Sequence, residues 1–469
     1  MQLVLIVVGL YMAVMLGIGL IFSKKSTDSA SYFLSGRSLP SFVLVFTFAA
    51  TWIGASSTLG KSGLAYTSGI SAISPTIGTF IAFFIFTAFA GRIRKIGAEH
   101  NISSIPELFE RRFGRTTSLI AALVIAYTLI GTTGTQLIAF SKVLEYIFKP
   151  YGISYVQALA VSVIIVVAYT VMSGMYGVAY TDVLQGVVLL ITLGCIVPFG
   201  AINMAGGWST VQASLPENFF VLRPDATMIG YTVTNFLYFV AGPPYWQRAL
   251  SAKSSGAAQR GVFGGNVIII FYSISIVIIG ICAAVIYPGV ASHDTEMVLL
   301  MMVEDLFPTI VYAFTVAGIM SVIMSTTDSY LILSAQTLAT DIVGKFRKDD
   351  DHKKTVLLSR LSVAFVGILS LVFALSMKDI FQAMMLSMSQ FAAGVAVPAL
   401  AALFSKKVTK EGMITSMLCG LGSSLIWAKV LMKPFGLSET IFGSVVSLIV
   451  IIIVSAVTQK KGEKVTFFE

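Results

Sequence analysis

Long apolar runs alternate with short polar segments along almost the whole chain, and polar residues do not alternate with apolar ones inside the runs. About 20 apolar residues in a helix cross a bilayer core of about 30 Å. Transmembrane β-strands would instead show alternating segments of about ten residues. The pattern predicts an all-α membrane protein with about 13 transmembrane helices. The runs lie near 2–22, 41–63, 70–91, 116–147, 154–174, 180–204, 227–249, 261–288, 305–341, 356–377, 380–404, 411–432 and 437–458.

Composition supports a membrane protein. The chain has 469 residues, of which 56% are hydrophobic and only 11% charged, whereas soluble domains carry about 25% charged residues. The longest polar connectors, near 92–115, 205–226 and 341–355, are too short to form a soluble domain. We therefore predict one membrane domain.

The net charge of +9 could indicate a nucleic-acid partner, but the positions of the basic residues argue against one. They gather in alternate loops, near 24–37, 92–115, 248–260, 345–360, 406–410 and 460–464, and Arg248 is counted here as a loop residue. The other loops hold Asp294, Glu296, Glu304 and Asp305. The positive-inside rule then places the N-terminus outside and the C-terminus in the cytoplasm. We expect a multi-pass, monomeric protein of the cell's plasma (bacterial inner) membrane.

The sequence offers little for catalysis or for a transition metal. Cys195, Cys282 and Cys419 lie singly in apolar runs, and the three histidines fall in loops. Neither a nucleophile–base pair nor a metal-ligand spacing is evident. The chain is therefore not expected to be an enzyme, although an aspartyl site made by Asp182 and Asp328 stays open as an alternative.

Two runs are interrupted by helix breakers. The second contains "FAATWIGASSTLGKSG" (48–63), and the seventh contains "NFLYFVAGPPYWQRAL" (235–250) with Gly242-Pro243-Pro244 in its middle. Proline removes a backbone donor and clashes with the preceding turn. Because each interrupted run opens a block of five runs, the pattern indicates an inverted-repeat transporter with a site near the midplane. Ordinary kinks in a bundle are the alternative. The expected parts are 1–40 (first helix and loop), 41–204 (first repeat), 205–226 (extracellular loop), 227–404 (second repeat) and 405–469 (two helices and tail).

The ninth run carries hydroxyls and a carboxylate in "SVIMSTTDSYLILS" (321–334). Val322, Ser325, Thr326 and Ser329 share one helical face, with Asp328 at its edge. Such oxygens suit a hard cation, although small polar residues also serve helix packing in membranes. A carboxylate within the membrane indicates a functional site. Asp182, near the cytoplasmic start of the sixth run, is the second such carboxylate, but it could simply cap its helix.

These segments resemble the sodium/solute symporter family, whose members carry sugars, amino acids, carboxylates, iodide, vitamins or choline with sodium. The similarity runs from "SYFLSGRSLP" (31–40) to the tenth core helix. Its most specific pieces are "YTDVLQG" (180–186), "QRALSAKS" (247–254) and "IMSTTDS" (323–329). Ser173-Gly174 departs from the family's usual Gly-Gly. The resemblance implies a LeuT-like fold, in which a five-plus-five inverted repeat follows one helix and precedes two.

The resemblance also implies binding sites. A main sodium site would use the carbonyls of Ala50, Ile53 and Val322 with the hydroxyls of Ser325 and Thr326. A second cation, either sodium or a proton, would lie near Asp182, Asp328 and Ser329. The solute would lie beside the broken helices. The residues implicated there are Trp52, Ser56, Ser57, Thr133, Gln136, Asn235, Tyr238, Phe239 and Gln390.

The solute itself is not identified by the sequence. "ATWIGASS" (50–57) looks like the matching piece of both choline carriers and pantothenate carriers. No obvious intramembrane cation would hold a carboxylate unless Lys61 or Lys142 reaches the site. We predict a sodium-coupled symporter that imports a small organic solute by alternating access, binding one or possibly two Na⁺. A proton-coupled or channel-like permease of the same fold is the alternative.

Overall fold

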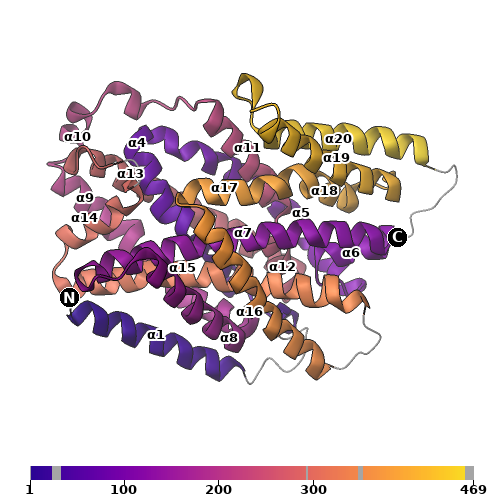
Figure 1. The fold of residues 1–469 in the computed structure, drawn as a ribbon, viewed down its shortest axis with the longest axis horizontal. Helices are drawn as coiled ribbons and strands as arrows, with labels where there is room; N and C mark the ends of the chain where they lie inside the picture. Colours follow the sequence, from indigo (N-terminus) through magenta and orange to yellow (C-terminus); the bar gives the residue numbers. More distant parts are fainter. Residues whose placement is uncertain (1, 24–32, 292–293, 347–351, 460–469) are drawn as a thin grey trace.

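The described part of the chain is a bundle of helices (Figure 1). The computed structural model describes residues 2–23, 33–291, 294–346 and 352–459. The middle of the predicted 341–355 connector and the basic tail near 460–464 lie outside these residues. No β-strand occurs in the described ranges, which contain one isolated bridge between Leu39 and Ala252. The all-α prediction is confirmed.

The main helices follow the predicted runs with a few additions. In chain order they are α1 (Gln2–Ser23), α3 (Ser41–Trp52), α4 (Lys61–Ser68), α5 (Ser74–Glu99), α6 (Ile105–Phe113), α7 (Arg115–Phe148), α8 (Tyr155–Ile191), α9 (Val197–Met204), α10 (Trp208–Ser214), α11 (Ala226–Ala241), α12 (Pro243–Ser251), α13 (Ser255–Ile286), α14 (Val298–Leu306), α15 (Thr309–Gln336), α16 (His352–Ser376), α17 (Ile380–Phe391), α18 (Val397–Phe404), α19 (Lys410–Lys429) and α20 (Glu439–Thr458).

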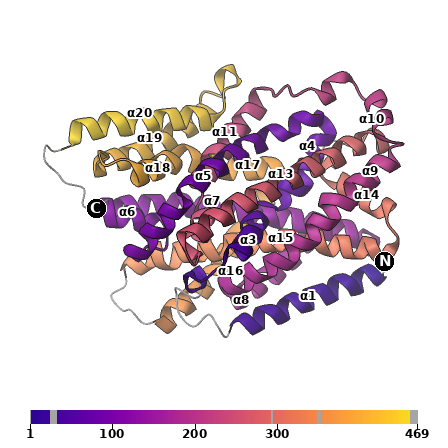
Figure 2. The same ribbon diagram turned by 180° about the vertical axis from the view of Figure 1, so that it is seen from behind.

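The hydroxyl-bearing helix α15 lies in the interior of the bundle. Every residue from Val316 to Gln336 is buried, and α15 packs against α1, α7, α8 and α16. On one flank α1 lies along α8, whereas α19 and α20 pack together on the opposite flank (Figures 1 and 2). The polar face of α15 is therefore enclosed by protein rather than by lipid.

Both predicted helix breaks are present. The helix α3 ends at Trp52, and Ile53 takes an extended conformation (φ −74°, ψ 97°) before a π-helical turn at Ser56–Gly60 leads into α4. The helix α11 ends at Ala241, where Gly242 is extended (φ −61°, ψ 132°) and Pro243 begins α12. Pro243 fits the first helical position because no backbone donor is needed there.

Other predicted boundaries differ. Eight helical stretches of the described chain are long and apolar enough to cross a membrane. The first halves of the two broken helices are not among them, because α3 has only 12 residues and α11 only 16, whereas α4 falls within the stretch Ser56–Glu99. The predicted gap between the fifth and sixth runs falls inside α8, which is helical from Tyr155 to Ile191. The 205–226 loop contains α10, and the 92–115 connector contains α6, which Ser104 caps through its side chain.

Candidate functional site

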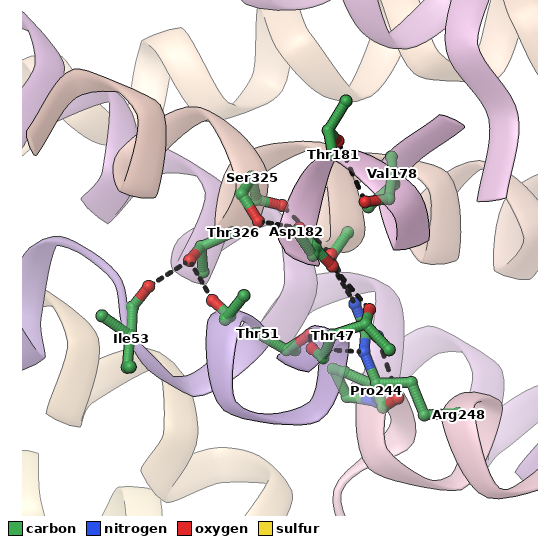
Figure 3. Close-up of polar contacts among 12 residues, drawn as sticks. Thr47, Thr51, Ile53, Val178, Thr181, Asp182, Pro244, Arg248, Ser325 and Thr326 are labelled. Atoms are coloured by element: carbon green, nitrogen blue, oxygen red, sulfur yellow. Dashed lines mark hydrogen bonds and ion pairs between the residues drawn. The ribbon is translucent and has the colours of Figure 1, made fainter. Parts of the chain in front are cut away.

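The broken end of α3 meets the hydroxyl face of α15. Thr326 Oγ1 donates to the carbonyl oxygens of Ala50 (3.1 Å) and Ile53 (2.9 Å), and Figure 3 shows its side chain facing Ile53. Gly54 N, which would bond Ala50 O in a continuous helix, instead donates to Ser57 Oγ at 2.9 Å. The break therefore exposes backbone oxygens to α15. The structure brings together Ala50, Ile53 and Thr326 of the predicted sodium site.

The other two residues of that predicted site lie beside Thr326. Val322 is one turn earlier on the same buried face of α15. The Ser325 hydroxyl is turned away from the carbonyls, since it donates to Asp182 Oδ1 of α8 (Figure 3). Asp182 Oδ2 also accepts from Thr47 Oγ1 at 2.5 Å. Asp182 is fully buried, and it lies within α8 rather than at the start of a helix. The alternative that it caps a helix start is therefore wrong.

Arg248 corrects a second expectation. It was counted among the loop cations, but it is fully buried, and its Nη2 lies 3.9 Å from Asp182 Oδ2. Its guanidinium donates to Ser329 Oγ (2.7 Å), Thr47 O (3.0 Å) and Pro244 O (3.2 Å). Arg248 is buried because the break at Gly242 places the start of α12 within the bundle, and every residue of α12 is buried. Only its position within the seventh run, four residues after Pro244, could have signalled this.

The three residues predicted for a second cation are therefore not equivalent. Asp182 and Ser329 both contact Arg248. Asp328 is buried separately and accepts a hydrogen bond from Thr170 Oγ1 of α8. The Arg248 charge offsets that of Asp182, whereas no cation of the described chain forms an ion pair with Asp328.

A cavity of about 380 Å³ lies on the other side of the α3 break. Five of the predicted solute-binding residues line it: Trp52, Ser56, Ser57, Asn235 and Phe239. The remaining lining residues are Gly54, Lys61, Pro75, Thr76, Phe381, Met384, Met385 and Met388. Among these additional lining residues, only Lys61 has a signal in the sequence, because it is the only charged residue in the interrupted segment 48–63.

Four predicted solute-binding residues do not line this cavity. Gln136 Oε1 accepts from Ala55 N at 2.8 Å and so supports the broken segment from behind. Thr133 is buried on α7. Tyr238 packs its ring against Phe391, with ring centroids 5.4 Å apart, and Gln390 bonds Ser389.

A larger vestibule of about 2180 Å³ adjoins this cavity. Phe381 lines both spaces, and its ring packs edge-on against Tyr231, with centroids 5.3 Å apart. The vestibule walls carry Glu145, Asp225, Asp294, Glu296 and Asp379 but only two lysines, Lys142 and Lys378. An excess of carboxylates in a recess attracts cations.

The donor set at the α3 break consists of neutral oxygens, which fit a hard cation such as Na⁺ better than a transition metal. Among the described residues, no group of three or more His, Cys, Asp or Glu side chains could hold a metal ion.

Comparison with known proteins is consistent with this geometry. The osmoregulated proline transporter of Bacillus subtilis is 27% identical over 478 residues, covering 98% of this chain and 96% of that protein. A sodium/proline symporter of Staphylococcus aureus is 28% identical over 483 residues, covering 97% and 93%.

Solved structures share the fold. A Na⁺-coupled sialic acid symporter in a substrate-bound outward-open state superposes with a TM-score of 0.84 at 21% identity, covering 98% of this chain and 99% of that one. A nucleobase-cation-symport-1 family transporter in a closed conformation gives a TM-score of 0.62 at 14% identity, covering 92% and 96%. Both are LeuT-fold transporters. The model of the sodium:solute symporter family matches residues 32–420. The chain belongs to the sodium:solute symporter family.

Proposed function

We propose that this protein is a sodium-coupled secondary active symporter that imports a small organic solute by alternating access. The observation that carries the proposal is the pairing of Thr326 Oγ1 with the carbonyls of Ala50 and Ile53. These oxygens lie on the same chain break whose other residues, Trp52 and Ser56, line the cavity. A cation at the break and a solute in the cavity would therefore stabilise the same segment.

Sodium would lie between the Thr326 hydroxyl oxygen and the two carbonyl oxygens, and the hydroxyl would keep its proton and turn it away from them. Ala50, Ile53, Val322, Ser325 and Thr326 would hold it, with Ser325 exchanging its contact with Asp182 for the ion. Gly54 separates this site from the cavity, and a Cβ there would lie 2.9 Å from Thr326 Oγ1. This short separation supports coupling between sodium and solute binding. If one ligand orders the segment around the α3 break, the conformational entropy cost of binding the other is lower.

The proposed architecture is an inverted repeat with one helix before it and two after it. The first repeat would comprise α3 to α9 and the second α11 to α18, with α1 before them and α19 and α20 after them. The vestibule at Lys142 and Glu296 would open to the outside, with Phe381 between it and the cavity. On the opposite side, Arg248, Asp182, Thr47 and Ser329 would close the inner path. The protein would act as a monomer in the plasma membrane.

Proline is the first solute to test, because two relatives are named as proline transporters. The sequence similarity of 50–57 to choline and pantothenate carriers makes those solutes the next candidates.

Uptake by proteoliposomes tests the proposal. An inward sodium gradient should drive saturable accumulation of at least one of these solutes above its external concentration. Accumulation driven by a proton gradient without sodium would favour the proton-coupled alternative. Non-saturable flux that never exceeds equilibrium would favour a channel-like permease and would overturn symport.

A further inference from the structure

The cavity contains one charged side chain, the Lys61 ammonium. Lys61 is only 2% exposed. Its Nζ donates to Thr76 Oγ1 and to Ser273 Oγ (3.3 Å), and it lies over the Trp52 ring, 4.5 Å from the centroid. The hydroxyl oxygens accept hydrogen bonds from the ammonium but do not neutralise its charge. No carboxylate of the described chain forms an ion pair with it, and none lines the cavity.

An uncompensated ammonium in the membrane interior is costly. Two other intramembrane cations, the buried Arg248 and the partly buried Lys142, are each matched with a carboxylate, Asp182 and Glu296 respectively. Lys61 differs from them because its counter-charge is missing from the protein. A bound anion would supply it.

Asn235 presents the complementary group. Asn235 is only 6% exposed, and its Nδ2 donates to Pro75 O at 2.8 Å. Its Oδ1 has no hydrogen-bond partner, although Asn235 lines the cavity. A buried acceptor without a partner carries a free-energy cost that a ligand N–H or O–H would remove.

These two groups converge on one place. Lys61 bonds Thr76 and Asn235 bonds Pro75, and these neighbours form the first turn of α5. The N-terminus of a helix also favours negative charge. The rest of the cavity wall is apolar, with Phe239, Met384 and Met388. The lining thus combines a cation and a hydrogen-bond acceptor beside the first turn of α5 with an apolar wall elsewhere.

We propose that the carried solute bears a carboxylate that pairs with Lys61 and, beside it, an N–H or O–H group that donates to Asn235 Oδ1. Amino acids and hydroxy acids with compact apolar bodies fit this description. Choline, which is cationic, does not. This inference rests on the proposed function, since it names the solute class of the same cavity.

Sodium-driven uptake of matched solutes tests the inference. The two acids are L-proline and pantothenate. Each is paired with a counterpart in which an uncharged group replaces the carboxylate, L-prolinamide and pantothenol respectively. Choline is the cationic probe. We expect uptake of an acid and none of its counterpart or of choline. Cyclopentanecarboxylate, which lacks the donor, should compete with L-proline at least about tenfold more weakly than L-proline itself. Sodium-driven uptake of choline, prolinamide or pantothenol would overturn the inference and leave symport standing. No sodium-driven uptake of any probe would overturn the proposed function, and the inference with it.

Lys61→Met should lower the affinity for the acid at least about tenfold, while Lys61→Arg should retain part of it. Because Lys61→Met removes an unpaired buried charge, we expect the melting temperature without solute to stay the same or rise. That result would separate recognition from a structural role, for which the melting temperature would fall. Lys95→Met, on the exposed Lys95–Glu99 pair of α5, is the matched control. Unchanged acid affinity in a folded Lys61→Met protein would contradict the proposal.

Discussion

Thr326 and Thr327 are adjacent on α15, but their hydroxyls have different partners. Thr326 Oγ1 reaches the carbonyls at the α3 break, whereas Thr327 Oγ1 bonds the carbonyl of Ile323 in its own helix. A threonine can make that local bond at little cost. The pair therefore provides a variant and its control at the same depth in the bundle.

We expect Thr326→Ala to weaken sodium binding roughly ten- to hundredfold, because losing an interaction with a charged group costs about 1.5–3 kcal/mol. The readout is the sodium-dependent increase in melting temperature, which should follow RT ln(1 + [L]/Kd). Thr326→Ser and Thr327→Ala should both retain it. The double variant Ser325→Ala/Thr326→Ala should lose it entirely. If that double variant kept the full sodium response, the cation would have to bind elsewhere.

Asp182 and Asp328 are expected to respond differently to neutralisation. Asp182→Asn would leave the buried Arg248 guanidinium without its carboxylate, and breaking such a pair costs about 3–5 kcal/mol. We therefore expect Asp182→Asn to lower the melting temperature, and Arg248→Met in the same chain to restore part of it. A double variant no more stable than Asp182→Asn would show that the two side chains do not compensate each other.

A second coupling ion, if one binds, should depend more on Asp328 than on Asp182, since Asp328 has no protein cation beside it in the described chain. With two sodium ions, uptake should show a Hill coefficient above one, and Asp328→Asn should lower it towards one. With a proton in that place, uptake should depend on external pH instead. A wild-type coefficient of one without pH dependence, unchanged in Asp328→Asn, would leave only the site at Thr326.

Among the elements, those with strong local signals were predictable from the sequence. The breaks at Ile53 and Gly242 follow from glycine and proline chemistry, and the face of α15 follows from helical spacing. The position of Arg248 inside the seventh run was a weak signal of burial, and it was outweighed by the basic residues that follow, because the direction of the side chain depends on where the break of α11 lies in three dimensions. For the same reason, Gln136 and Tyr238 were predicted to contact the solute, whereas in the structure neither side chain lines the cavity. Side-chain direction depends on packing between distant helices.

The first turn of α17 is tied to α7 through one carboxylate. Glu296 Oε1 accepts from the backbone N–H groups of Ile380 (2.8 Å) and Phe381 (3.3 Å), and Oε2 accepts from Lys142 Nζ at 2.6 Å. Glu296 is thus hydrogen-bonded to the backbone of Phe381, the residue that lines both the vestibule and the cavity. Burial raises the pKa of Glu296, and the Lys142 ammonium offsets part of that increase.

This raised pKa predicts a pH dependence of stability. Between the ordinary value of 4.5 and the higher folded value, the folded protein binds more protons at Glu296 than the unfolded chain does. The free energy of unfolding should therefore fall as pH rises through that window. Glu296→Gln should remove this component of the slope, and Lys142→Met should extend the window to higher pH. Melting curves of the three proteins across a pH series provide the measurement. A Glu296→Gln protein with the wild-type pH slope would assign the slope to other groups.

At the scale of the whole molecule, the described helices place the two cavities relative to the basic loops. The vestibule is lined by Asp225, Asp294 and Glu296, which lie in the loops with few cations. Lys253 and Glu411 lie at the basic end, past α12 and at the start of α19. In Figure 1 the α10 end and the α6 end are on opposite sides of the bundle. If the basic loops are cytoplasmic, the vestibule opens outwards, as an importer requires.

Cysteine labelling can test this orientation in intact cells. We expect Ser209→Cys, an exposed position on α10, to react with a membrane-impermeant maleimide from outside, and Lys253→Cys, also exposed, to react only after permeabilisation. The physical reason is that lysines and arginines are retained on the cytoplasmic side. Cys195, Cys282 and Cys419 would first be replaced by alanine so that they do not contribute. Asp350, in the most charged connector, lies outside the described residues, so the two positions above are the better probes. Labelling of Lys253→Cys from outside intact cells would invert the topology. The Phe381 side of the cavity would then face the cytoplasm, and the vestibule could not be the entry route for an imported solute.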